Sequence, residues 1–208
     1  METKSKKILI LFYSTYGHVE TMAKKVQEGV NSVPGLKADL YRVPETLSDE
    51  VLGKMYAPKK NDEIPTLTYD KVDELANYDG ILFGVPTRFG MICAQMKAFW
   101  DATGGLWSKG GLVGKPAGFF FSTGTQGGGQ ETTVLTALPF LAHHGMVFVP
   151  PGYTMGKELF TNDEDRGGSA YGAGSYAGAD GSRQPSEIEL KNCKHQGEYF
   201  AKFDARLS

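Results

Sequence analysis

Short apolar runs alternate with amphipathic stretches along this chain of 208 residues. The run Ile8 to Tyr13 is too short for a buried helix and is typical of a strand covered on both faces. Residues 19–30 then carry apolar side chains at helical spacing. Further strands are predicted at 37–43, 80–85, 115–122 and 146–149, and further helices at 94–102 and 131–141. This order predicts an α/β protein with a doubly wound, five-stranded parallel sheet and helices on both faces.

Two segments interrupt this alternation within a single predicted domain, residues 1–208. Residues 44–77 are polar and proline-bearing, with one short helical pattern, and are expected to form an exposed insertion. Residues 152–185 are rich in glycine and cannot carry a core of their own. Because a linker of that length is unusual inside a domain, we expect a functional loop packed against the sheet edge or a neighbouring subunit.

Two helix ends can be read from local signals. Ser186 and Glu189 form a capping box, which predicts a C-terminal helix over residues 186–206. The glycines of Gly104-Gly105-Leu106-Trp107 are expected to end the helix at 94–102.

The stretch Ser14-Thr15-Tyr16-Gly17-His18-Val19 links the first predicted strand to the first predicted helix. Such a link exposes backbone N–H groups and the positive end of a helix dipole, which stabilise an anion. Gly17 permits a sharp turn, and the Ser14 and Thr15 hydroxyls can donate hydrogen bonds. The alternative is an ordinary turn capped by Ser or Thr. The motifs of nucleoside-triphosphate and dinucleotide sites are missing here, so a neutral cradle for the phosphate of flavin mononucleotide (FMN) is favoured.

Two more loops of this kind follow the third and fourth predicted strands. They are Pro86-Thr87-Arg88-Phe89-Gly90 and Ser122-Thr123-Gly124-Thr125-Gln126-Gly127-Gly128. The carboxyl ends of parallel strands meet at one edge of a sheet, so the loops should gather around one ligand. Their hydroxyl and backbone groups suit the edge of a planar heterocycle, whose faces need apolar cover. Tyr16, Phe89 and Trp107 are candidates for that cover, with core packing as the alternative.

Charge and composition exclude several classes of partner. A net charge of −2 and a pI near 6.1 leave no broad basic face, so nucleic acid is not expected as a partner. No segment approaches the roughly 18 apolar residues that span a bilayer, and no signal-peptide pattern follows residues 1–7. We therefore expect a soluble, cytoplasmic protein without a transmembrane segment.

The two cysteines, Cys93 and Cys193, form no Cys-x-x-Cys pattern. Neither a disulfide framework nor a metal site is therefore expected. Cys93 begins a predicted helix, where a thiol can have a lowered pKa, although simple packing is the alternative.

Six motifs, in order, resemble those of the WrbA family of NAD(P)H:quinone oxidoreductases over about residues 6–203. They are Ser14-Thr15-Tyr16-Gly17-His18, Pro86-Thr87-Arg88-Phe89-Gly90, Thr103-Gly104-Gly105-Leu106-Trp107, Ser122-Thr123-Gly124-Thr125, Leu141-Ala142-His143-His144-Gly145 and Gly181-Ser182-Arg183-Gln184-Pro185. Two departures occur, since Gln126 is an extra residue in its loop and Met91-Ile92-Cys93 replaces the Asn that often follows Phe-Gly. The resemblance implies a flavodoxin-like fold, bound FMN and a homotetramer built as a dimer of dimers.

The resemblance also implies roles for these loops. Residues 14–19 would hold the FMN phosphate and ribityl chain. Thr87, Arg88 and Phe89 would line the isoalloxazine, with Pro86 and Gly90 also in contact with the cofactor, and residues 122–128 would hold its other edge. His143 would lie beside the flavin. Trp107 and Tyr16 would shape the site for nicotinamide and quinone.

The implied reaction is a ping-pong reduction of a small-molecule quinone by NADH or NADPH. Arg88 or oriented backbone N–H groups would stabilise negative charge on the reduced flavin, and His143 would donate a hydrogen bond or proton to the quinone oxygen. The alternative for His143 is that it only ends its helix. The sequence selects neither the nicotinamide nor the quinone, and it does not separate a dimer from a tetramer.

A second class of function is a flavin-binding electron carrier or regulatory scaffold with incidental reductase activity. Carriers usually dock through a strongly charged face, and the charges here are nearly balanced. A scaffold role leaves little trace in one sequence, and peripheral association with membranes stays open as well.

Overall fold

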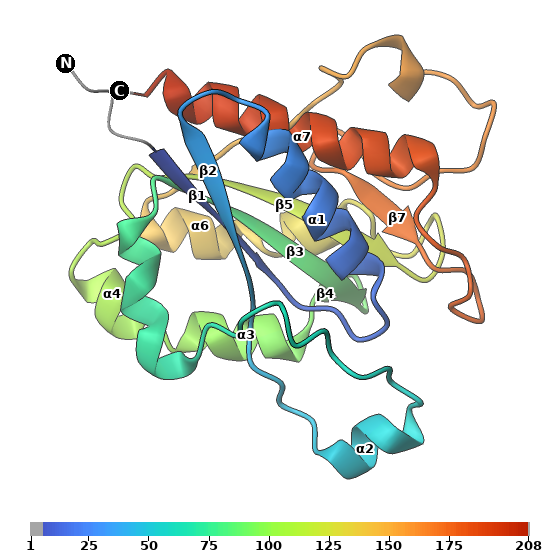
Figure 1. Cartoon of the computed structure of the whole chain (residues 1–208), viewed down its shortest axis with the longest axis horizontal. Helices are drawn as coiled ribbons and strands as arrows, with labels where there is room; N and C mark the ends of the chain where they lie inside the picture. Colours follow the sequence, from blue (N-terminus) through green and yellow to red (C-terminus); the bar gives the residue numbers. More distant parts are fainter. Residues whose placement is uncertain (1–5, 208) are drawn as a thin grey trace.

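Five parallel strands form the central sheet in the order β2-β1-β3-β5-β6, as Figure 1 shows. The structure is a computed structural model that describes residues 6–207. The strands are β1 Lys6–Phe12, β2 Leu36–Arg42, β3 Gly80–Arg88, β5 Pro116–Thr123 and β6 Val147–Phe148. The doubly wound parallel sheet is confirmed. The strand order reverses between β1 and β3, and ligands bind outside the carboxyl ends of strands at such a switch point.

Helices cover both faces of the sheet because neighbouring residues of β1 point to opposite sides. Ile8 and Ile10 pack beneath α1 (His18–Asn31) and α7 (Glu187–Ala205), which lie in front in Figure 1. Leu9 and Leu11 pack on the other side. The elements of that side are η1 (Tyr69–Asn77), α3 (Ala94–Asp101), α4 (Gly104–Ser108), α5 (Thr132–Leu135) and α6 (Leu138–His144). The capping box of Ser186 and Glu189 begins α7 as predicted.

Two helix predictions were wrong in detail. Gly104-Gly105-Leu106-Trp107 does not end a helix, because it forms most of α4, directly after Thr103. The helix predicted at 131–141 is divided into α5 and α6. Pro139 lies in the first turn of α6 and has no N–H group with which to continue α5 through this point.

A short strand, β7 (Gly174–Tyr176), lies within the segment predicted to be a loop. It pairs in parallel with the end of β5, beyond the two residues that pair with β6. A Cβ on Gly172, just before β7, would lie 2.1 Å from the Phe119 carbonyl oxygen, so the chain can approach β5 only with glycine here. Glycine carries no hydrophobic pattern, which is why the sequence did not reveal this strand. A second short strand, β4 (Met91–Ile92), pairs antiparallel to the end of β3, and η2 is Lys157–Leu159.

The insertion at 44–77 is exposed only in its first part. The helix α2 (Asp49–Lys54) buries none of its residues and stands away from the body in Figure 1. Leu67 and Leu75, in the returning part, are buried in the core, and the Leu67 N–H donates to the Arg42 carbonyl at 2.9 Å. The polar run that precedes them in the sequence concealed this contribution. No helix within residues 6–207 combines the length and apolar character needed to cross a membrane.

Both cysteines are buried and unpaired. Burial raises the pKa of the Cys93 thiol to about 11, so the structure favours packing over a reactive thiol. We expect iodoacetamide at pH 8 to alkylate the native cysteines at least about 100-fold more slowly than a free thiol. Mass spectrometry before and after unfolding in urea measures this difference. Rapid labelling of Cys93 in the folded protein would contradict its burial.

Candidate functional site

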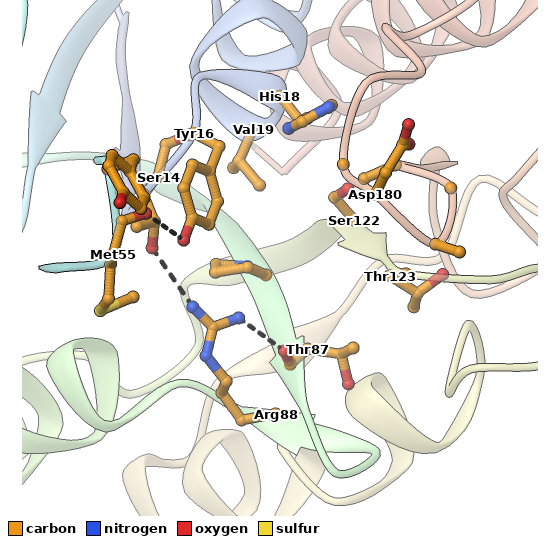
Figure 2. A pocket seen from close by; sticks show the side chains of 18 residues that line it. Ser14, Tyr16, His18, Val19, Met55, Thr87, Arg88, Ser122, Thr123 and Asp180 are labelled. Atoms are coloured by element: carbon orange, nitrogen blue, oxygen red, sulfur yellow. Dashed lines mark hydrogen bonds between the residues drawn. The ribbon is translucent and has the colours of Figure 1, made fainter. Parts of the chain in front are cut away.

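A cleft of about 560 Å³ opens at the carboxyl ends of β1, β3 and β5 (Figure 2). The three Ser/Thr/Gly loops contribute to it as the sequence predicted. Its other walls come from the insertion and from the glycine-rich loop, and no site residue was predicted in the parts of these that line it. The lining residues are Ser14, Thr15, Tyr16, His18, Val19, Met55, Tyr56, Pro86, Thr87, Arg88, Ser122, Thr123, Gly124 and residues 177–181.

The start of α1 forms one end of the cleft. Gly17 has φ +94°, a left-handed conformation, and within residues 6–207 no side chain caps the helix. The Gly17 N–H donates to the Ser14 Oγ at 3.0 Å, which leaves the Ser14 hydroxyl proton available to a ligand. Because the first N–H groups of a helix have no intrahelical partner, this end of the cleft can receive an anion.

His18 joins this helix to the glycine-rich loop. Its side chain is buried, and its Nε2 lies 2.9 Å from the Arg183 carbonyl oxygen. Arg183 donates to the fully buried Glu189 carboxylate at 3.0 Å, which also accepts the Gly167 N–H at 2.7 Å. These contacts hold loop 177–181 over the cleft. The role of His18 in this arrangement is to fix the wall of the site.

The end of β5 supplies two buried hydroxyls with different partners. Thr123 Oγ1 donates to the Thr125 carbonyl and accepts from the Gln130 amide, both at 2.6 Å, so its proton is already used. Ser122 Oγ accepts from Ser175 at 3.2 Å and keeps its own proton. Ser122 is therefore the better hydrogen-bond donor to a ligand. Figure 2 shows Ser122 and Asp180 on the side of the cleft away from Met55 and Arg88.

Arg88 connects the β3 loop to the cradle. One guanidinium nitrogen donates to the Thr87 carbonyl at 2.8 Å and the other to Thr15 Oγ1 at 3.2 Å. On the same side, the Tyr16 hydroxyl donates to the Met55 carbonyl at 3.1 Å, which brings the insertion against the cleft (Figure 2). The sequence predicted Thr15, Tyr16 and Arg88 as one site, and the structure places them together.

An apolar groove of about 780 Å³ adjoins the cleft and shares Arg88 and Met55 with it. Its walls include Phe89, Met91, Trp100, Phe140 and His143. The Trp100 and Phe140 rings stack on each other at 4.0 Å in the wall of the groove. The apolar and aromatic lining suits an aromatic or quinonoid ring, which buries apolar faces. His143 lines this groove and does not line the cleft.

The neighbouring His144 has a different environment. It is buried, and its Nε2 lies 2.9 Å from the Thr103 hydroxyl oxygen. Burial, and then the charge of His143, lower the pKa of His144. His144 therefore packs as a neutral side chain against Phe140, one of the groove residues, with the ring centroids 4.6 Å apart.

The remaining predicted residues lie apart from the cleft within one protomer. Phe89, Gly90 and residues 126–128 surround a separate hollow. Trp107 is half exposed, and its indole N–H donates to the His143 carbonyl at 2.9 Å. Trp107 thus supports the end of α6, and it lines neither the cleft nor the groove.

The chemistry of the cleft fits FMN. Its volume lies in the range of about 300–1,000 Å³ typical of cofactor sites. The start of α1, with Ser14, suits a phosphate, and Arg88 at the other side suits an electron-rich ring edge. Doubly wound folds with this strand order and a ligand cradle after β1 form the class of flavodoxin-like proteins, to which this chain is assigned on fold and site.

Comparisons with known proteins give the family. Residues 7–159 match the family model described as NADPH-dependent FMN reductase. The chain is 61% identical to a quinone-oxidoreductase of Triphysaria versicolor, covering 94% of this chain and 93% of that protein. It is 52% identical to an NAD(P)H dehydrogenase (quinone) of Geobacter sulfurreducens, covering 97% and 98%. The chain belongs to the NADPH-dependent FMN reductase family and, within it, groups with the NAD(P)H:quinone oxidoreductases. The family predicted from the six motifs is confirmed.

A solved structure supports the fold independently. The crystal structure of a flavodoxin, WrbA-like protein from Agrobacterium tumefaciens superposes with a TM-score of 0.66 at 21% identity, covering 98% of this chain and 100% of that one. This likeness concerns the fold, because the identity is low.

Proposed function

We propose that this protein reduces quinones to hydroquinones with NADH or NADPH, through FMN bound in the cleft. The observation that carries the proposal is the apolar groove, which shares Arg88 with the FMN cleft and is lined in part by the aromatic side chains of Phe89, Trp100 and Phe140. The relatives named as quinone oxidoreductases support the same activity. Bound FMN supplies the two-electron redox chemistry, and the protein supplies binding and orientation.

Each wall of the site has a task in this proposal. The N–H groups at the start of α1, with the Ser14 and Ser122 hydroxyls, hold the phosphate and ribityl end. Thr87 and Arg88 face the ring, where the Arg88 guanidinium stabilises negative charge. Because NAD(P)H and quinone would use the same groove in turn, a ping-pong order follows.

Replacement of His143 by alanine tests its proposed donation to the quinone oxygen. We expect the quinone half-reaction to slow by about 100-fold, the lower end of general-acid effects, while NAD(P)H reduction and FMN content stay unchanged. Single-turnover stopped-flow absorbance separates the two half-reactions. His195→Gln, on α7, is the matched control. An unchanged quinone rate in His143→Ala would leave His143 with only a role at the end of α6.

We further propose a cytoplasmic homotetramer, arranged as a dimer of dimers. Exposed apolar side chains beside the groove support this, since Phe89 and Met91 are 98% and 50% exposed in one protomer. Size-exclusion chromatography with light scattering gives the mass directly. A monomer at micromolar concentration would contradict the proposal.

A further inference from the structure

A chain of hydrogen bonds runs from the mouth of the FMN cleft, through the buried Tyr13, to Glu45 at the start of the insertion. Arg88 Nη2 donates to Thr15 Oγ1 at 3.2 Å, and this hydroxyl donates to Tyr13 Oη at 3.3 Å. Tyr13 Oη donates in turn to Glu45 Oε2 at 2.9 Å. The four residues come from three segments at the sheet edge: Tyr13 and Thr15 follow β1, Glu45 follows β2, and Arg88 ends β3. The side chain of Tyr13, which is only 2% exposed, forms the buried middle of this series of hydrogen bonds.

The two ends of this chain fix its direction. A guanidinium group can only donate, an ionised carboxylate can only accept, and each hydroxyl between them has one proton. Burial raises the pKa of the Glu45 carboxyl, but hydrogen bonds from Leu47, Gln95, Tyr13 and Thr46 outweigh this and lower it to about 2. Glu45 is therefore ionised at neutral pH. The Thr15 proton points to Tyr13, so in this arrangement Thr15 offers the cleft an acceptor, whereas the sequence predicted a donor there.

The same carboxylate fastens the insertion that forms another wall of the cleft. Glu45 Oε1 accepts the N–H groups of Thr46 and Leu47 at 2.9 and 3.1 Å. The Lys60 ammonium group, on the returning part of the insertion, lies 3.3 Å from Oε2. Both ends of the segment that carries Met55 are thus held at Glu45.

We propose that Glu45 is a positioning residue of the FMN site, which acts through Tyr13 and Thr15 to hold the Arg88 guanidinium at the mouth of the cleft. Glu45 and Tyr13 do not line the cleft. The proposal rests on the proposed function in one respect, because the fixed charge of Arg88 acts on bound FMN. Holding this charge close favours the reduced cofactor and raises its two-electron potential.

The hydrogen-bond chain can be tested first without the cofactor. Tyr13→Phe, Glu45→Gln and the double variant form a cycle measured by urea unfolding of the apoprotein. We expect a coupling of about tenfold in the unfolding equilibrium constant, because the bond involves a charged acceptor. Additive effects of the two substitutions would overturn the link between Tyr13 and Glu45.

The effect on FMN is tested by the two-electron potential of the bound cofactor. We expect Tyr13→Phe and Thr15→Val each to reduce the preference for the reduced cofactor about three- to tenfold. This corresponds to a two-electron potential of bound FMN that is lower by about 15–30 mV. Thr15→Ser should restore the wild-type value. Tyr78→Phe is the matched control, because Tyr78 makes a similar bond to Asp39 at 3.1 Å away from the cleft.

Two outcomes separate this proposal from the proposed function. If wild-type protein binds no FMN, the proposed function fails. The unfolding cycle still decides whether Tyr13 and Glu45 are linked by a hydrogen bond. If FMN binds and the potential of Tyr13→Phe equals that of the wild type, Glu45 does not position Arg88. Tyr13→Phe carries this test even where Thr15→Val loses FMN, since it changes no side chain that lines the cleft.

Discussion

Replacement of Glu189 by alanine should lower the free energy of unfolding by about 3–5 kcal/mol, the cost of breaking a buried ion pair. The Glu189 side chain is fully buried and accepts hydrogen bonds from Arg183, from the Gly167 N–H and from the Ser186 N–H. The substitution leaves these donors without their acceptor and removes one half of the capping box. Urea unfolding, followed by circular dichroism, measures the loss.

The same substitution should weaken FMN binding. Arg183 holds loop 177–181, which lines the cleft, and its carbonyl meets His18 on α1. Titration of the apoprotein with FMN should therefore give at least about a tenfold higher Kd, equivalent to roughly 1.4 kcal/mol. Glu187→Ala is the control, because Glu187 is exposed in the same first turn of α7. Equal stability of the two variants would contradict the structural role of Glu189.

Gly197→Ala should lower the free energy of unfolding by about 3 kcal/mol or more, at the upper end of overpacking effects. Gly197 lies where α7 crosses α1, and a Cβ there would lie 2.1 Å from the Val26 carbonyl oxygen. The reciprocal position, Gly29, has its nearest contact at 2.0 Å from the Lys194 carbonyl oxygen. Because both obstacles are backbone atoms, the helices must separate to admit a methyl group.

The matched control for Gly197 is Gly53→Ala in α2. Nothing lies within 4 Å of the Cβ position of Gly53, so the methyl group enters open space. The higher helix propensity of alanine should stabilise this variant by up to about 1 kcal/mol. Thermal and urea unfolding of both variants test the comparison. A Gly197→Ala protein as stable as the wild type would show that α1 and α7 are not in close contact.

The sheet could be predicted from the sequence because its strands are covered on both faces. Ile8 and Leu9 point to opposite sides, and both are buried, so an unbroken apolar run marks β1. The three polar loops follow such runs, and the geometry of a parallel sheet places them together. The main architecture and the position of the cleft therefore follow from local pattern alone.

Other parts of the site depend on contacts that no local pattern contains. Tyr13 counts as an apolar residue of the first strand, although its hydroxyl links Thr15 to Glu45. Met55 and Asp180 belong to segments whose path over the cleft is set by distant partners. Glu45 looks like one of many surface carboxylates until the folded chain surrounds it with donors. Such residues were missed because their neighbours are brought together only by the tertiary fold.

His143 and Trp107 were predicted at the site but do not line the cleft. The resemblance implied that both lie at the flavin or substrate site, and the structure places His143 on the groove, while Trp107 lines neither cavity and donates to the His143 carbonyl. Both residues lie near the start of β5, because the Gly114 N–H donates to the Gly145 carbonyl at 2.8 Å just after α6. Within one protomer they are therefore not at the carboxyl edge of the sheet that holds the cleft. The proposed role of His143 concerns the quinone in the groove.

We propose that NAD(P)H and a quinone react in turn at FMN in this site. Anaerobic stopped-flow absorbance of the purified holoprotein tests it most directly. We predict that NADH or NADPH bleaches the flavin band, and that a quinone mixed in afterwards restores the band at a rate no slower than turnover. If neither nicotinamide bleaches the flavin, the protein is not an NAD(P)H:quinone oxidoreductase, and a flavin-binding carrier or scaffold takes its place.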